Sequence, residues 1–240
     1  MIVKTGLQAH LTEAATMRFV AENTSIPVPK IYCSFVHKGR AFTLMERIQG
    51  EPIATALRKL SDLDQWKVYA QLRAMIQELR AINPPSNTGV QSCTGGSLHD
   101  SRITHGLPRF GPFKTIQAFH FWLRREMSVP DIQTYSKESR HECDWTAVEK
   151  MATMQDGQWP PSVFTHADLN PCNILVHGNK VVSIIDWEFS GWYPDYWEYT
   201  SSWYGAIVHT QWQDEILKFF EPFPKELSME ITRQKYWGSI

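Results

Sequence analysis

The chain has 240 residues, of which 42% are hydrophobic and 20% are charged, and its formal net charge is −1. A chain of this length can bury the core of one large domain or of two smaller lobes. A net charge this close to zero excludes a global basic field, so neither nucleic acid nor a membrane is expected as a partner.

Cysteine use and hydropathy favour a reducing compartment. The four cysteines form no C-x-x-C pair and no zinc-ligand spacing; they are Cys33, Cys93, Cys143 and Cys172. Scattered thiols of this kind are expected to stay reduced. Residues 1–11 lack the apolar core of a signal peptide, and no run approaches the roughly 18 apolar residues of a membrane span. The sequence therefore predicts a cytoplasmic protein.

The first 49 residues predict a small unit rich in β-structure, in the order strand, helix, strand, strand. The expected elements are a strand ending at Lys4, a helix over 11–23 capped by Thr12, and two strands over 31–36 and 41–45. Lys38-Gly39 supplies the turn between the last two strands.

The next segments predict helices separated by loops. A helix is expected over 61–82, where Ser61 can cap the first turn and apolar residues recur at helical spacing. Residues 86–113 are rich in glycine and proline and predict a loop. Further helices are expected over 115–127 and 144–155, with a solvated charged face between them.

Residues 163–199 carry the strongest chemical pattern. His166-Ala167-Asp168 is followed by Asn173, and two short strands over 174–176 and 181–185 turn at Gly178-Asn179. Asp186 stands at the end of the second strand. The hairpin should bring Asp168, Asn173 and Asp186 together, and their oxygen atoms suit a hard cation such as Mg²⁺.

Aromatic helices are expected after this hairpin, over 195–208 and 211–220, with a loosely packed tail from residue 221. Asp195 could cap the first of these helices, whereas a carboxylate such as Asp195 or Glu198 could instead brace the catalytic loop or meet a substrate amine. Five tryptophans in this part should pack a core, and a minority could line a pocket; they are Trp187, Trp192, Trp197, Trp203 and Trp212.

The order of a His, a small residue and Asp, then Asn, then I-D-W-E at 185–188 resembles the aminoglycoside phosphotransferase and choline kinase family. Ala167, where protein kinases have arginine, and Trp187, where they have phenylalanine, separate the chain from protein kinases. The continuation GWYPDYWEY over 191–199 resembles phosphotransferase-like proteins abundant in filamentous fungi. The resemblance extends over about residues 3–204.

This resemblance implies an α+β, two-lobed protein kinase-like fold. It assigns residues 1–49 to a truncated, β-rich N-terminal lobe and residues 50–240 to a mainly helical C-terminal lobe with the catalytic and metal loops. It also implies phosphoryl transfer from ATP, with Mg²⁺, to a hydroxyl group of a small-molecule acceptor.

The resemblance also implies roles for individual residues. Asp168 would accept the proton of the attacking hydroxyl, and His166 would brace its loop more plausibly than carry a proton. Asn173 and Asp186 would hold the metal.

For the nucleotide, Lys4 would contact phosphates while paired with Glu13, and the hinge backbone at Glu46 and Ile48 would meet adenine. Without the resemblance, Lys4 also fits a solvated terminal lysine, and Glu13 a first-turn glutamate favoured by the helix dipole.

The family has two strands and a phosphate-covering loop before the lysine strand, whereas here Lys4 follows three residues. Three readings are compatible with this: a working kinase with half a small lobe, a shortened gene model, or loss of phosphoryl transfer. The alternative functions are therefore a catalytically impaired pseudokinase or a repurposed scaffold in fungal specialised metabolism.

Overall fold

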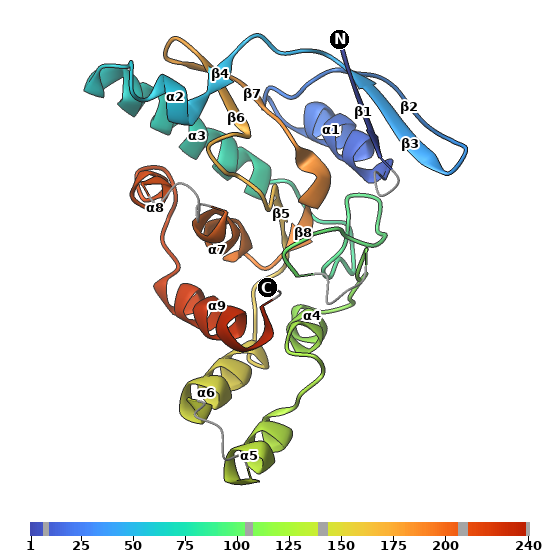
Figure 1. The fold of residues 1–240 in the computed structure, drawn as a ribbon, viewed down its shortest axis with the longest axis vertical. Helices are drawn as coiled ribbons and strands as arrows, with labels where there is room; N and C mark the ends of the chain where they lie inside the picture. The colour runs from blue at the N-terminus through green and yellow to red at the C-terminus, as the bar shows by residue number, and fades with distance from the viewer. Residues whose placement is uncertain (7–9, 104–107, 139–143, 206–210, 239–240) are drawn as a thin grey trace.

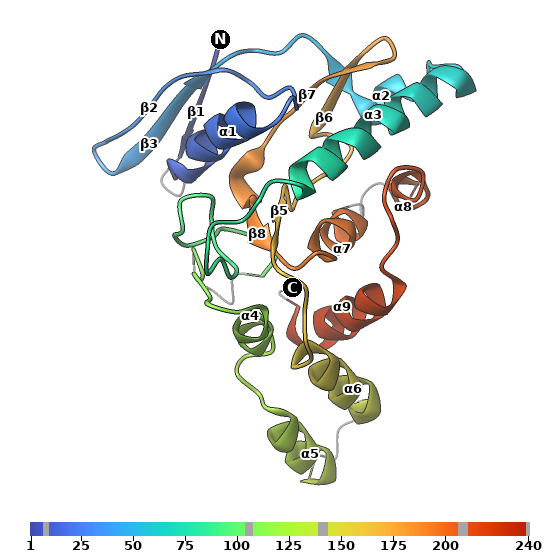
Figure 2. The same cartoon turned by 180° about the vertical axis from the view of Figure 1, so that it is seen from behind.

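A computed structural model shows a mixed α/β fold with small antiparallel sheets and many helices (Figure 1). It describes residues 1–6, 10–103, 108–138, 144–205 and 211–238. The N-terminal sheet lies at one end of the long axis, and the helices α5 and α6 lie at the other (Figures 1 and 2). The predicted division into residues 1–49 and 50–240 stays a prediction.

The N-terminal sheet has three antiparallel strands in the order β1-β3-β2, with β1 at one edge. Its elements are β1 (Ile2–Gly6), α1 (Thr12–Asn23), β2 (Ile31–His37) and β3 (Arg40–Met45). Met17 and Val20 of α1 share a buried core with Met45 of β3. The predicted strand, helix, strand, strand order is confirmed.

The remaining chain contributes most of the helices. They are α2 (Ile53–Ala56), α3 (Asp62–Arg80), α4 (Ile116–Leu123), α5 (Val129–Glu138), α6 (Trp145–Gln155), α7 (Trp197–Tyr204), α8 (Trp212–Ile216) and α9 (Pro224–Trp237). The predicted cap of α3 is confirmed, because Ser61 accepts the Asp64 N–H. Helix α4 is capped in the same way by Thr115, which accepts the Ala118 N–H. No helix in the described ranges is both long enough and apolar enough to cross a bilayer.

Short strands hold the segment with the strongest chemical pattern. One sheet has the order β4 (Glu51–Pro52), β6 (Ile174–His177), β7 (Lys180–Ile184), and β5 (Val163–Thr165) pairs with β8 (Gly191–Tyr193). The hairpin between β6 and β7 turns at Gly178, whose φ is 58°, and a short 3-10 helix, η1 (Trp187–Phe189), follows β7. The predicted hairpin is confirmed.

The predicted packing of the tryptophans is also confirmed for the most part. Four of them are buried, namely Trp187, Trp192, Trp197 and Trp212, and Trp203 packs partly buried against the core. They belong to two hydrophobic clusters that extend through the helical part. Most of the aromatic load therefore stabilises the fold.

Three local predictions were wrong, and each has a physical reason. Thr12 lies inside α1 and pairs with the His10 ring, so it does not cap the helix. Asp195 precedes α7 without capping it, since Tyr196 takes the N-cap position. The tail from residue 221, predicted as loosely packed, packs as α9. The predicted solvated charged face is largely confirmed in the described residues, because Arg125, Asp131 and Lys137 are exposed and Arg124 is the buried exception; residues 129–138 of this face form α5. The part of the predicted helix 195–208 beyond residue 205 lies outside the described residues.

Candidate functional site

The loop after β5 is held by a buried carboxylate. Glu198 of α7 is 3% exposed, and its two oxygens accept the N–H groups of His166 at 2.6 Å and Ala167 at 3.0 Å. Ala167 has φ 66°, in the left-handed region that costs energy for a residue with a side chain. Burial raises the pKa of Glu198 to about 7, against the effect of the two N–H groups. Two roles were predicted for a carboxylate here: bracing the loop or contacting a substrate amine. The contacts of Glu198 support the bracing role.

His166 is a structural part of this loop. Its Nε2 donates to the Ile185 carbonyl at 3.0 Å, and its Nδ1 accepts the Asp168 N–H at 3.2 Å. Burial lowers the pKa of His166 to about 4, so the ring is neutral near pH 7. Both ring nitrogens are engaged, which supports the predicted bracing role over proton transfer.

Two side-chain amides hold one carboxylate oxygen of Asp168 in place. Its Oδ2 accepts the side-chain amides of Asn170 at 3.1 Å and Asn173 at 2.9 Å. Burial raises the pKa of Asp168, while the guanidinium of Arg102 opposes that rise. The side chain is 18% exposed, so a substrate hydroxyl can reach it.

Asn173 and Asp186 lie at adjacent points of the hairpin. The Asn173 carbonyl accepts the Ile185 N–H at 2.9 Å, which places Asp186 one residue beyond that contact. Asp186 has φ 64°, and this turn directs the chain from β7 into η1. The structure thus brings Asp168, Asn173 and Asp186 to one region, as the hairpin pattern in the sequence predicted.

Lys4 of β1 joins that region from the N-terminal sheet. Its Nζ lies 3.0 Å from Glu13, 2.7 Å from Asp186 and 3.2 Å from Glu188. Burial disfavours the ammonium, but the three carboxylates hold the pKa of Lys4 above its ordinary value. The predicted Lys4–Glu13 pair therefore exists, and Glu188 extends it.

The donor set fits a divalent cation. Oxygens of Glu13, Asp186 and Glu188 can come within 4.8 Å of one another, and carboxylates are preferred Mg²⁺ ligands. The Asn173 amide donates to Asp168 through its nitrogen, which leaves its oxygen available. The ammonium group of Lys4 lies 2.7–3.2 Å from all three carboxylates, so this group of carboxylates attracts positive charge.

The predicted hinge residues lie apart from this group. The backbone N–H of Glu46 donates to the Lys30 carbonyl at 2.9 Å, and its carboxylate accepts the Lys30 N–H at 3.3 Å. Within the described ranges, the backbone of Ile48 has no protein hydrogen-bond partner. Ile48 can therefore offer its N–H and carbonyl to a ligand, whereas the Glu46 N–H is already used.

Sequence reasoning missed a half-buried arginine and its buried carboxylate partner. Arg102 forms a two-point ion pair with Asp100, at 2.8 and 2.6 Å, and donates to the Ala167 carbonyl at 2.5 Å. Its Nη1 lies 3.6 Å from Asp168 Oδ1. No local pattern in the loop 86–113 marks these residues. Glu188 was also missed as a site residue, although it belongs to the I-D-W-E motif.

Residues 6–221 match the sequence model of the phosphotransferase enzyme family. A search of curated proteins gives no significant match. Solved structures of similar fold include a thermostable mutant of aminoglycoside phosphotransferase APH(4)-Ia with ADP and hygromycin B. It is 14% identical with a TM-score of 0.63, over 96% of this chain and 75% of that one.

Two further structures are similar at the level of the fold. A type VIII aminoglycoside-3'-phosphotransferase is 14% identical with a TM-score of 0.57, over 98% of this chain and 84% of that one. The streptomycin–ATP complex of APH(2")-IIa is 15% identical with a TM-score of 0.52, over 94% of this chain and 70% of that one. At these identities the likeness shows the kinase-like fold alone.

Proposed function

This chain belongs to the phosphotransferase enzyme family, and we propose on that premise that it transfers the γ-phosphoryl group of ATP to a hydroxyl of a small molecule. One observation carries the proposal. The carboxylate of Asp168, restrained by Asn173, lies in the same region as the Lys4–Asp186 pair, which joins residues 182 positions apart.

Asp168 is assigned the role of orienting and deprotonating the acceptor hydroxyl. A carboxylate restrained by Asn170 and Asn173 can orient a hydroxyl and take its proton as the oxygen–phosphorus bond forms. The bond between the γ-phosphorus and the β-phosphate oxygen then breaks, and ADP leaves with those electrons. His166 keeps the loop in place through its two ring nitrogens.

Contact with the phosphates, directly or through the metal, is assigned to Lys4, Asn173, Asp186 and Glu188. Magnesium, when bound by Asn173 and Asp186, would neutralise phosphate charge. Lys4 would exchange its contacts with Asp186 and Glu188 for phosphate oxygens and keep Glu13 as its partner. The 35% exposure of the Lys4 side chain supports this exchange.

The remaining assignments concern adenine, the acceptor and the compartment. The free backbone groups of Ile48, beside Glu46, would meet adenine. Two of the similar structures hold a nucleotide and an aminoglycoside by their descriptions, namely ADP with hygromycin B and ATP with streptomycin. They support a nucleotide donor and a small-molecule acceptor, and we assign the protein to the cytoplasm.

The second candidate function is nucleotide binding without transfer, as in a pseudokinase. The favouring observation is that Lys4 Nζ lies 2.7 Å from Asp186 and 3.2 Å from Glu188, so the lysine occupies the space between carboxylates that a metal ion would need.

Magnesium-dependent ATP turnover with a panel of hydroxylated amines separates the two functions. We expect Asp168→Asn to lower turnover by about 10²–10⁴-fold, the usual contribution of a general base. Asp195→Asn is the matched control, because Asp195 lies outside the site and should leave turnover unchanged. Unchanged turnover in Asp168→Asn would remove the assignment, and no turnover in the parent chain would favour the pseudokinase.

A further inference from the structure

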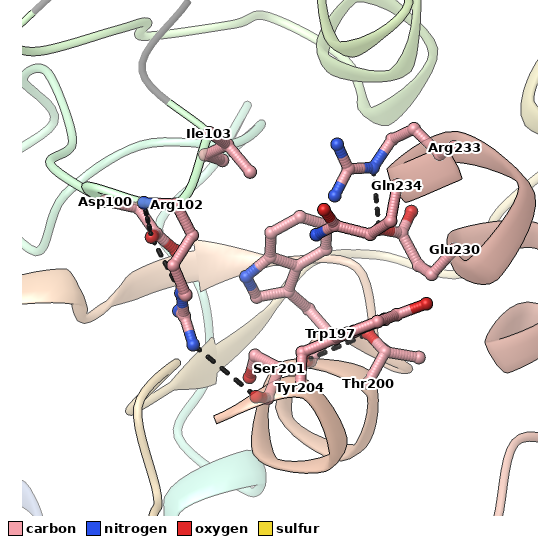
Figure 3. A pocket seen from close by; sticks show the side chains of 10 residues that line it. All are labelled: Asp100, Arg102, Ile103, Trp197, Thr200, Ser201, Tyr204, Glu230, Arg233 and Gln234. Carbon is pink, nitrogen blue, oxygen red and sulfur yellow. Dashed lines mark hydrogen bonds and ion pairs between the residues drawn. The ribbon is translucent and has the colours of Figure 1, made fainter. Parts of the chain in front are cut away.

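Helix α9 borders hollows of very different size. The hollow beside Trp197 (Figure 3) has a volume of about 20 Å³, which holds about one water molecule. The charged groups around it are paired with each other, Asp100 with Arg102 and Glu230 with Arg233. The hollow between α6 and α9 has a volume of about 500 Å³, which is within the usual range for small-molecule sites.

This larger hollow is a groove between one face of α6 and one face of α9. Its nine lining residues recur at helical spacing on each helix; they are Ala147, Lys150, Met151 and Met154 on α6, and Pro224, Lys225, Ser228, Met229 and Thr232 on α9. Met151 and Met229 are 2% and 3% exposed and belong to one hydrophobic cluster, so they form the floor of the groove.

The lining favours a flexible alkyl chain. Its three methionines have unbranched side chains that adapt to irregular apolar shapes. None of the nine residues is aromatic, so a flat ring would find no stacking partner. The hydroxyl of Thr232 already donates to the Ser228 carbonyl at 3.1 Å. A sugar or a peptide would therefore find few hydrogen-bond partners in this groove.

The charged residues of the lining are two exposed lysines, one on each wall. Lys150 lies on α6 and Lys225 on α9, and no carboxylate is among the nine lining residues. Within the described ranges, neither ammonium forms an ion pair. Their methylene stems can cover apolar surface while the charges stay in water. The groove thus combines an apolar floor with positive charge, which complements a ligand with an apolar chain and an anionic end.

The size of the groove favours a small molecule over a protein partner. A stable protein interface usually involves about 20–30 residues on each side, whereas nine residues line this groove. Lysine is a compact point charge, in contrast to the planar fork of arginine, so two lysines suit a simple carboxylate.

We propose that the groove between α6 and α9 binds an alkyl carboxylate, such as a medium-chain fatty acid. The chain would lie on the three methionines, and the carboxylate would accept from the ammonium groups of Lys150 and Lys225. The groove shares no residue with the site assigned to ATP and the acceptor, so this proposal does not rest on the proposed function.

The test is an NMR titration of the whole chain, labelled with ¹³C in its methionine methyl groups. Octanoate is the probe. Octanol keeps the chain but lacks the charge, octylamine carries the opposite charge, and acetate lacks the chain. We expect octanoate to shift the signals of the groove methionines Met151, Met154 and Met229, while the signal of Met75 in α3 stays in place.

The affinities should rank by chain and charge. Octanoate should bind about tenfold or more tightly than octanol and octylamine, the value of one charge-assisted hydrogen bond. Acetate should shift no methionine signal, because it lacks the apolar chain that the floor would bury.

Replacing both lysines in one chain, as Lys150→Gln and Lys225→Gln, should lower the affinity for octanoate to that for octanol. The affinity for octanol should not change, which also shows that the variant is folded. Lys137→Gln is the matched control. Lys137 is an exposed lysine on the neighbouring helix α5 that does not line the groove, so its replacement should leave the full difference in place.

The proposal is overturned if octanoate binds no more tightly than octanol, if the difference survives in the double variant, or if Met75 shifts as much as the groove methionines. A glutamate-rich amphipathic peptide is the competing occupant. If the peptide shifts the groove signals and octanoate does not, the groove is a protein-docking site and the proposal is wrong. Because the titration contains neither ATP nor magnesium, absence of phosphoryl transfer would leave its result intact.

Discussion

Lys4 shows what a single residue contributes to this site. It links β1 to Asp186 and Glu188 while Glu13 fixes it from α1. Its contacts span separate segments, so its role depends on tertiary structure that the local sequence does not encode. The resemblance to a family, rather than the residues around it, predicted the pair with Glu13.

Lys4→Met should weaken binding of ATP with magnesium by about 10- to 100-fold, because a charge-assisted bond to a phosphate is lost. Isothermal titration measures this directly. Lys38→Met, in the exposed turn between β2 and β3, should bind as the parent chain does. Equal affinity in the two variants would show that Lys4 is a structural ion-pair partner and not a phosphate ligand.

Glu198 should make stability depend on pH. Its pKa is raised from 4.5 to about 7 in the folded chain, so the folded state holds a proton that the unfolded state has released. The contribution of Glu198 is therefore present below about pH 4.5 and decreases as pH rises through about 7, by on the order of 2–3 kcal/mol.

Denaturant unfolding of the parent chain and Glu198→Gln at pH 5 and pH 8 measures this contribution. Glutamine does not titrate, so the parent's advantage in free energy of unfolding should shrink at pH 8. A constant or larger advantage at pH 8 would show that the two backbone N–H groups keep Glu198 ionised throughout.

The proximity of some residues was predictable where their contacts are local in sequence. Asp168, Asn173 and Asp186 share one hairpin, so spacing and strand pattern were enough to predict that they lie together. Arg102 was not predictable, because its contact with Asp168 depends on how a long loop without regular structure folds back onto α7.

At the scale of elements, proline explains one of the errors. Pro224 opens α9, where proline is compatible with a helix because its missing N–H would have no partner. Proline was instead taken as a sign of loose packing in the tail. In α3, Leu63 and Trp66 are 67% and 58% exposed, so the helical spacing of apolar residues overestimated the buried face.

The packing of α9 can be tested on two of its faces. Met229 is 3% exposed and Ile231 is 50% exposed. We expect Met229→Ala to lower the free energy of unfolding by about 2–4 kcal/mol, because it leaves a cavity in the core. Ile231→Ala should stay within about 0.5 kcal/mol of the parent. Similar losses in both would mean that α9 does not pack as described.

The whole molecule combines segments that are distant in sequence. The pair Lys4 with Asp186 connects the N-terminal sheet to the end of the hairpin β6–β7, and the pair Gln91 with Trp192 connects the loop 86–113 to β8. The sequence predicted the elements of the sheet and hairpin, and the resemblance supplied their arrangement. The contacts of the loop 86–113 and of α9 with α7 could not be predicted, because the loop has no regular pattern and α9 was not expected to fold as a helix.

The central claim is that this arrangement moves a phosphoryl group. The most direct measurement is ³¹P NMR of the purified chain with ATP, magnesium and a hydroxylated amine that the chain binds. We expect loss of the γ-phosphate signal of ATP and growth of a phosphate monoester signal, both absent in Asp168→Asn. An unchanged ATP spectrum, from a chain that binds both ligands, would contradict it and identify a binding protein in place of a phosphotransferase.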